Sequence, residues 1–228
     1  MLWDQIMAFL QDPDTWSGPN GIPALTWEHV LISMTATTVA VVLVFPLGLW
    51  LGHRRKGADI AGAVVNVGRA IPSFGVLVLT VMVLVELGAS VLTPWPVLVA
   101  LIALAAPPIF TNTIAGIQGV DRATIEAGRG MGLTEGQIIG RVEMPLSSPV
   151  IIEGLRIALV QVIATATLGA LVAWGGLGRL IVDGFNQRNN GKVLVGAFLV
   201  ALLAVVAEVG LSIAGRVSTP QGLRPRPD

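Results

Sequence analysis

Residues 30–51 form a run of 22 residues without a single charged side chain. As an α-helix, which rises about 1.5 Å per residue, this run reaches roughly 33 Å and crosses the hydrocarbon core of a bilayer, which is about 30 Å thick. The basic cluster His53-Arg54-Arg55-Lys56 follows directly, as is typical where a span meets the polar interface. The run therefore predicts a transmembrane helix, and a chain that carries it is expected to fold in a membrane.

Four further apolar segments of similar length follow along the chain. They cover residues 61–85, 96–117, 149–174 and 193–215. Hydrophobic residues make up 54% of the chain and charged residues only 12%, about half of their share in an average soluble domain. Isolated strands in lipid would leave backbone groups unpaired, so these segments are expected to be helices. We predict an all-α, polytopic membrane protein with about five transmembrane helices, the second of them kinked at Pro72.

The basic residues are distributed unevenly between the two sides that these spans define. With the cluster at 53–56 placed in the cytoplasm, ten basic residues fall inside and three outside. Because cytoplasmic segments carry the excess of Lys and Arg, the N-terminus is predicted outside and the C-terminus in the cytoplasm. The chain then divides into an extracytoplasmic N-terminal segment (1–26), a transmembrane domain (27–216) with a cytoplasmic loop (121–146), and a cytoplasmic tail (217–228).

Composition argues against several classes of protein. The 14 basic and 14 acidic residues balance, so the chain lacks the basic excess of a nucleic-acid-binding domain, and no nucleic acid is expected as a partner. Without cysteine it has no disulfide and no thiolate metal site, and no metal is expected. Its two histidines, His29 and His53, lie near predicted span ends, and neither a nucleophile elbow nor a phosphate-binding loop is present. An enzyme is therefore not expected.

The polar loop between the third and fourth spans contains residues that typically begin and end two short helices. Asp121 is placed to cap a first helix, which Gly132 ends because glycine tolerates the left-handed conformation found after a helix. Thr134, with Gln137 three residues later, has the pattern of a capping box for a second helix. Pro145 is expected to end that helix and turn the chain back to the membrane. The predicted result is a rigid helix–corner–helix element on the cytoplasmic side.

The same loop carries a spaced motif: Glu126-Ala127-Gly128, then Gly132, then Val142-x-Met144-Pro145. It resembles the EAA loop of ABC importer permeases, which reads E-A-A, three residues, G, nine residues, I-x-L-P. The spacing is kept at every step, and Gly128, Val142 and Met144 are conservative departures. The resemblance implies a MetI-like type I permease fold in the cell membrane of a bacterium, with a loop that docks on an ATPase subunit. ATP and magnesium would bind to that ATPase, and no cofactor to this chain.

Three further segments are similar to the glycine betaine/choline subfamily of these permeases. They are Arg69-Ala70-Ile71-Pro72-Ser73, Asn112-Thr113-x-x-Gly116-Ile117-x-Gly119-Val120-Asp121 and Gly175-Gly176-Leu177-Gly178. The resemblance covers residues 27–216 and implies osmoprotectant uptake with two ATPase subunits, a second permease chain, identical or similar, and an extracytoplasmic solute-binding protein. The chain has no tyrosine and no evident aromatic cage for a quaternary ammonium group, so the selective site is expected on that binding protein.

Polar residues inside the predicted spans are candidates for the pathway or its gate, since such groups are costly in lipid. Each has a second interpretation: Arg69 can snorkel to the inner headgroups, and the uncharged polar residues can bond to neighbouring helices. Pro72 is a candidate because the kink expected there would shape the pathway or its gate. An outer turn of small residues is a candidate contact for the binding protein, or simply a helix end. The pathway candidates are Arg69, Pro72, Ser73, Asn112, Gln161 and Thr165, and the outer turn is Gly175, Gly176 and Gly178.

Two other functions stay open at this point. An ABC importer for another small solute, such as an amino acid, would differ only in its binding protein. An ion-coupled secondary transporter is disfavoured, because such proteins commonly show inverted repeats and paired intramembrane acids. The five predicted spans are an odd number, and no paired acids lie at mid-depth; Glu153 and Arg156, three residues apart, are placed to pair with each other instead.

Overall fold

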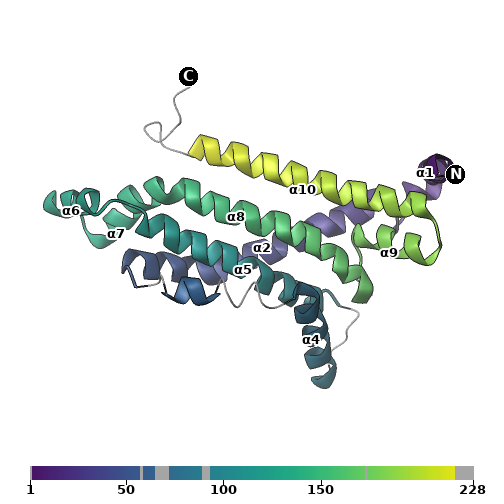
Figure 1. The fold of residues 1–228 in the computed structure, drawn as a ribbon, viewed down its shortest axis with the longest axis horizontal. Helices are drawn as coiled ribbons and strands as arrows, with labels where there is room; N and C mark the ends of the chain where they lie inside the picture. Colours follow the sequence, from purple (N-terminus) through teal and green to yellow (C-terminus); the bar gives the residue numbers. More distant parts are fainter. Residues whose placement is uncertain (1, 57–58, 65–71, 89–92, 173, 219–228) are drawn as a thin grey trace.

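The computed structural model describes residues 2–56, 59–64, 72–88, 93–172 and 174–218. Every regular element among them is helical, which confirms the predicted all-α class. The long helices run side by side along the long axis of the molecule, with α1 at one end and α6 and α7 at the other (Figure 1). In chain order the elements are α1 (Leu2–Gln11), η1 (Pro13–Thr15), α2 (Ile22–His53), α4 (Ser73–Glu86), α5 (Trp95–Gln118), α6 (Arg122–Gly130), α7 (Glu135–Ile138), η2 (Ile139–Glu143), α8 (Met144–Ala166), η3 (Thr167–Val172), α9 (Gly178–Asn186) and α10 (Asn190–Ser218).

Four helices of the described chain are long and apolar enough to cross a membrane. They are α2, α5, a continuous helix over Glu135–Val172, and α10 over Asn190–Arg216. These four coincide with the first, third, fourth and fifth predicted spans, although α2 begins earlier than predicted, at Ile22. About five spans were predicted; the described residues contain four full spans and one shorter apolar helix, Phe74–Glu86.

The second predicted span is not one kinked helix. Pro72 has extended backbone angles (φ −63°, ψ 128°) and caps the N-terminus of α4, so the helix begins after it instead of bending through it. The reason is that proline has no backbone N–H and clashes with the preceding turn in a helix interior, whereas at a helix start neither matters. With 14 residues, α4 reaches about 21 Å, less than a full span. Arg69 lies outside the described residues.

The helices pack in the order α2, α5, α8, α10, each against the next. The helix α4 lies against α5, while α1 and α9 lie against α10. The core between α2, α4, α5 and α8 consists largely of alanine and branched aliphatic side chains, which lets the helices approach closely. Its buried members are Ile32, Ala36, Ala40, Leu77, Val97, Ala100, Leu101, Ala105, Ile109, Ala158, Val162 and Ala166.

The closest approach of α5 and α8 is at Gly154. A Cβ atom built on Gly154 would lie 2.5 Å from the Cβ of Asn112 and 2.8 Å from the carbonyl oxygen of Pro108. Both distances are shorter than real Cβ contacts, so only glycine fits without a shift of the backbone. The Asn112 amide donates to that same Pro108 oxygen at 2.8 Å, which fixes its side chain along α5.

The second loop helix and the fourth span form one uninterrupted helix. From Glu135 the chain passes through α7, the π-helical turn η2 and α8 without a break, so the expectation that Pro145 ends the second loop helix is wrong. The wider π turn directly before Pro145 places its ring in the first turn of α8, where a missing N–H costs little. Pro149, predicted to begin the span, lies inside α8.

Three charged side chains join α8 to α10. Arg156 pairs with Glu153 on its own helix, as the spacing predicts, and with Glu208 of α10 at 2.9 Å. The positive charge thus lies between two carboxylates in a part of the chain that is otherwise apolar. Pairing of this kind is how charges are accommodated within membrane-spanning helices.

Candidate functional site

The helix–corner–helix element predicted for the polar loop is present as α6 and α7. Asp121 caps α6: its Oδ1 accepts from the backbone N–H of Ala123. Thr134 and Gln137 form the predicted capping box, in which the backbone N–H of Thr134 donates to Gln137 Oε1 at 2.9 Å and the Gln137 N–H donates to Thr134 Oγ1. Each cap satisfies backbone donors that a helix start leaves free. Both predicted helix starts are therefore confirmed.

The corner between the two helices depends on a left-handed residue. Gly132 has φ +84°, and its N–H donates to the carbonyl of Arg129, while the N–H of Leu133 donates to Gly128. These bonds close the C-terminus of α6 and reverse the chain within three residues. The prediction that Gly132 ends the first helix is confirmed.

A small apolar core holds the corner rigid. Val120, Ile125 and Ile138 are buried there, with Leu133, Val142 and Leu146 packed against them. The motif residues divide between the two sides of this core. Gly128 is buried and Val142, Met144 and Pro145 are half-buried, whereas Glu126, Ala127 and Gly132 are exposed. The element thus presents its acidic end outward and uses its apolar end for packing.

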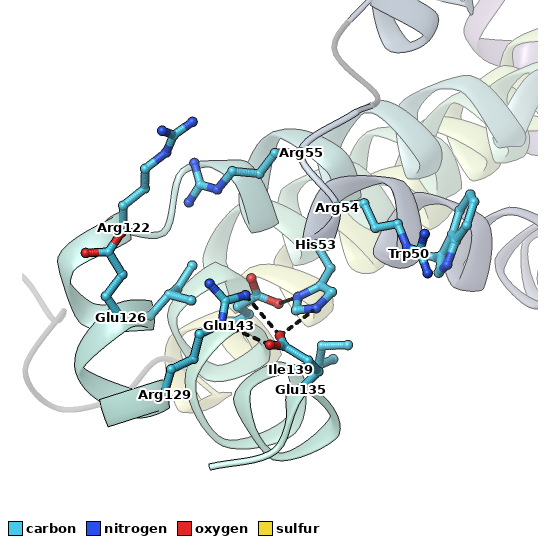
Figure 2. A pocket seen from close by; sticks show the side chains of 11 residues that line it. Trp50, His53, Arg54, Arg55, Arg122, Glu126, Arg129, Glu135, Ile139 and Glu143 are labelled. Atoms are coloured by element: carbon cyan, nitrogen blue, oxygen red, sulfur yellow. Dashed lines mark hydrogen bonds and ion pairs between the residues drawn. The ribbon is translucent and has the colours of Figure 1, made fainter. Parts of the chain in front are cut away.

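A charged network ties the corner to the C-terminal end of α2 (Figure 2). His53, the last residue of α2, lies 2.7 Å from Glu143 through Nδ1 and 3.1 Å from Glu135 through Nε2. Arg129 of α6 donates to both carboxylate oxygens of Glu135, at 2.9 and 3.0 Å. The hydrogen bond to Glu135 raises the pKa of the Arg129 guanidinium above its usual value. Glu143 is the buried member, with only 1% of its surface exposed.

Arg55 binds the backbone where the chain leaves α5 and enters the loop. Its guanidinium donates to the carbonyl oxygens of Gln118 and Val120, at 3.2 and 2.7 Å, where α5 ends. A cation at this position satisfies free carbonyls and complements the negative end of the helix dipole. The neighbouring Arg54 lies over the ring of Trp50, 4.9 Å from its centroid.

Together these elements surround an open pocket of about 580 Å³ at the C-terminal end of α2. Its walls carry both signs of charge and combine polar with apolar surface, as docking surfaces for proteins do. Figure 2 shows Arg129 within the His53 network, Arg54 beside Trp50, and Arg55 and Arg122 away from the network. The lining residues are Trp50, His53, Arg54, Arg55, Arg122, Ile125, Glu126, Arg129, Glu135, Ile139 and Glu143.

The predicted pathway residues do not gather in one place. The side-chain amide of Asn112 donates a hydrogen bond to the Pro108 carbonyl at the α5–α8 crossing. Gln161 is exposed on α8, and Thr165 lies beside a small gap lined by Leu77 and Val97. Pro72 is exposed before α4, and Ser73 is the first residue of that helix. Arg69 falls outside the described residues, so its place in a pathway stays a prediction.

The predicted outer turn packs against the beginning of α2. The N–H of Gly176, which has φ +77°, donates to a carboxylate oxygen of Glu28 at 2.9 Å. A Cβ atom on Gly175 would collide with that carboxylate, and one on Gly178 would lie 2.3 Å from the carbonyl oxygen of Thr167. Close backbone packing therefore accounts for the small residues, whatever else binds there. Nearby, Nε2 of buried His29 donates to the Ile163 carbonyl at 2.9 Å.

A comparison with known families identifies the chain. The family described as "Binding-protein-dependent transport system inner membrane component" matches residues 44–214, which include the corner, all of α5 and α8, and parts of α2 and α10. The chain belongs to this permease family. The match extends across the motif at 126–145, and the predicted membership of the binding-protein-dependent permeases is confirmed.

Individual relatives agree with this assignment. The permease is 37% identical to the carnitine transport permease protein OpuCB of Listeria monocytogenes over 97% of its own length and 96% of the relative's. It is 35% identical to the choline transport system permease protein OpuBB of Bacillus subtilis, over 87% and 89% of the two chains. A chain of the MetNI methionine ABC transporter in an inward-facing conformation superposes with a TM-score of 0.76 at 25% identity, covering 92% of the permease and all of that chain. The predicted MetI-like fold is therefore confirmed.

Sequence reasoning missed the residues that connect the corner to α2. His53 was noted only as a residue near a span end and as part of the basic cluster at 53–56. Glu143 occupies the position that the motif leaves unspecified, between Val142 and Met144. Both are functional candidates in the permease because they join separate elements. One indication was available: a glutamate inside an otherwise apolar stretch needs a partner. Met131, 77% exposed at the corner, was missed as well.

Replacing Gly132 with alanine is expected to loosen the corner without changing the spans. A Cβ at this position meets no atom within 4 Å, so the cost arises only from the left-handed backbone, about 1 kcal/mol. Hydrogen exchange at the amides of Gly128–Leu133 should become about fivefold faster. Gly130→Ala is the matched control, because Gly130 is helical and also has open space around it. Equal exchange rates in the two variants would contradict the prediction.

Proposed function

We propose that this permease is the membrane-spanning subunit of an ATP-driven importer of compatible solutes that carry a quaternary ammonium group, such as glycine betaine, choline and carnitine. The observation that carries the proposal is the near full-length similarity to permeases named for carnitine and choline transport. The motif residues Glu126 to Pro145 supply the means of coupling. The same solutes follow from the resemblance of the residues around Pro72, Asn112 and Gly176 to the glycine betaine/choline subfamily.

An importer of another small solute, such as an amino acid, is the second candidate. The structural likeness to a chain of a methionine transporter favours it, but that likeness comes with 25% identity against 37% for the carnitine permease. Fold alone does not decide the solute, because one architecture hosts many functions. The quaternary ammonium solutes are therefore the preferred class.

The proposed partner on the cytoplasmic side is an ATPase subunit that docks on α6 and α7 and binds ATP and magnesium. Support comes from the shape of the element: the corner protrudes beyond the spans (Figure 1), exposes Glu126 and Met131, and is held by its own small core. A rigid projection transfers displacement between subunits, whereas a loose loop would absorb it. The continuity of α7 with α8 gives this displacement a direct route into the membrane.

A second permease chain, identical or similar, and an extracytoplasmic solute-binding protein complete the proposed assembly. Gln161 is exposed on α8 within the spans, and an exposed amide there is better placed against a partner or a polar pathway than against lipid. The turn at Gly175, Gly176 and Gly178 lies at the opposite end of the molecule from the corner and is the proposed contact for the binding protein. This arrangement requires the N-terminus outside and the C-terminus in the cytoplasm.

Uptake of labelled glycine betaine, choline and carnitine tests the proposal. Cells that lack other osmolyte importers would carry the permease with its ATPase and binding protein, or the same set without the permease. We expect uptake of at least one of the three solutes only in the first strain, and loss of uptake when ATP is depleted while ion gradients are kept. Uptake unchanged by deletion would contradict the solute class, and uptake that survives ATP depletion would favour an ion-coupled transporter.

A further inference from the structure

His53 faces a carboxylate with each of its two ring nitrogens. Nδ1 lies 2.7 Å from Oε2 of Glu143, and Nε2 lies 3.1 Å from Oε2 of Glu135 (Figure 2). Both distances are within hydrogen-bond range. The three residues come from α2, α7 and the π-helical turn η2, and His53 and Glu143 are separated by 90 residues of chain. His53 is therefore the point where the inner end of α2 meets the coupling corner.

The two hydrogen bonds of His53 require one proton more than a neutral imidazole and two ionised carboxylates hold. An ionised carboxylate can only accept hydrogen bonds, and a neutral imidazole has a single N–H. Two hydrogen bonds to two carboxylates need one more proton, carried either by the imidazole or by the carboxyl of Glu143. The proton belongs to the pair, since the two groups are in direct contact.

The surroundings make this contact important to the position of the turn. Glu143 is 1% exposed, so without His53 its carboxylate would be left buried and unpaired, which is strongly unfavourable. Glu135 is oriented by two hydrogen bonds from Arg129 of α6. The remaining charged groups that face the pocket are Arg54 and Arg55, directly after α2, and Arg122 and Glu126 from α6.

We propose that His53 is a positioning residue for energy coupling: through the proton it shares with Glu143, it fastens α2 to the coupling corner, so that a displacement of the corner moves α2 together with α8. The inference rests on the proposed function, because coupling presupposes an ATPase at the corner. α8 needs no such fastening, since it is continuous with α7. α2 has no backbone connection to the corner, and the network at His53 joins it to α6, α7 and η2 at once.

The test uses the complete complex of permease, ATPase and binding protein reconstituted in liposomes, and measures solute taken up per ATP hydrolysed. His53→Ala is expected to lower this ratio by about tenfold, within the range of coupling between linked sites. Glu135→Gln alters an exposed side chain of the same network and is also expected to lower the ratio. It serves as a second variant in case the complex with His53→Ala does not assemble. Lys56→Gln, a charge change at an exposed residue just beyond the network, is the matched control and should keep the wild-type ratio.

The pH profile distinguishes positioning through a proton from simple packing. The two hydrogen bonds of His53 need one proton more than a neutral imidazole and two carboxylates hold, so the wild-type ratio is expected to fall as the pH is raised. His53→Arg, which keeps its charge, should show a ratio that does not change with pH. A ratio for both His53→Ala and Glu135→Gln equal to that of the wild type, or the same pH response in wild type and His53→Arg, would overturn the proposal. Absence of any ATP-dependent uptake by the wild type would instead contradict the proposed function itself.

Discussion

Replacement of Gly154 with leucine is expected to separate α5 from α8 and to cost about 3 kcal/mol of stability, the upper part of the usual range for overpacking. Even a Cβ atom at this position would lie 2.5 Å from the Cβ of Asn112 and 2.8 Å from a backbone oxygen. The oxygen belongs to Pro108 inside α5, so it cannot rotate away as a side chain would. The two helices must move apart, which opens the core that Ala105, Ile109 and Ala158 fill between them.

The measurement is thermal unfolding of the permease in detergent, with the fraction of monodisperse protein as a second readout. A loss of this size is expected to lower the unfolding temperature by roughly 10 °C for a chain of this length. Gly210→Leu is the matched control, because Gly210 lies on α10 with no atom within 4 Å of its Cβ position. The prediction fails if the two variants unfold at the same temperature.

The second large effect is expected at the charge triad between α8 and α10. Arg156→Met leaves the carboxylates of Glu153 and Glu208 without their shared partner. Unpaired charges among membrane-spanning helices are costly, so this variant is expected to be less stable than the wild type. Since Glu208 is on α10, the loss should appear as weakened packing of that helix. The measurement is again the unfolding temperature, together with protease accessibility of α10 in membranes.

A triple variant separates the charge effect from the loss of packing by the arginine side chain. In Glu153→Gln/Arg156→Met/Glu208→Gln all three charges are gone, and no carboxylate is left unpaired. We expect this variant to be more stable than Arg156→Met alone, because replacing an entire ion-pair network costs less than removing one partner. An Arg156→Met variant as stable as the wild type would show that the triad contributes nothing.

Features governed by neighbouring residues were predictable from sequence. Asp121, Thr134 and Gln137 cap helices through bonds that reach at most three residues, and Gly132 adopts a backbone angle that depends on its own lack of a side chain. The long spans were equally accessible, because uninterrupted apolar runs need no tertiary information. For these elements the local pattern and the final structure agree.

The structural roles of two prolines and one histidine could not be predicted from local sequence patterns. Pro145 was expected to end a helix, but a π-helical turn ahead of it lets the helix continue. Pro72 was expected to kink a helix that in fact starts after it. The partners of His53 are fixed by how α2 packs beside the loop, 90 residues later in the chain for Glu143, and spacing in sequence says nothing about such a meeting.

The continuous helix from the corner into the membrane has a consequence for architecture. Over Glu135–Val172 it has 38 residues, which at about 1.5 Å each amounts to roughly 57 Å, well beyond the hydrocarbon thickness of about 30 Å. Held upright, the surplus lifts the corner clear of the headgroups. The permease thus has a built-in stalk, and under the proposed function the stalk's length sets how far from the lipid surface the proposed ATPase subunit sits.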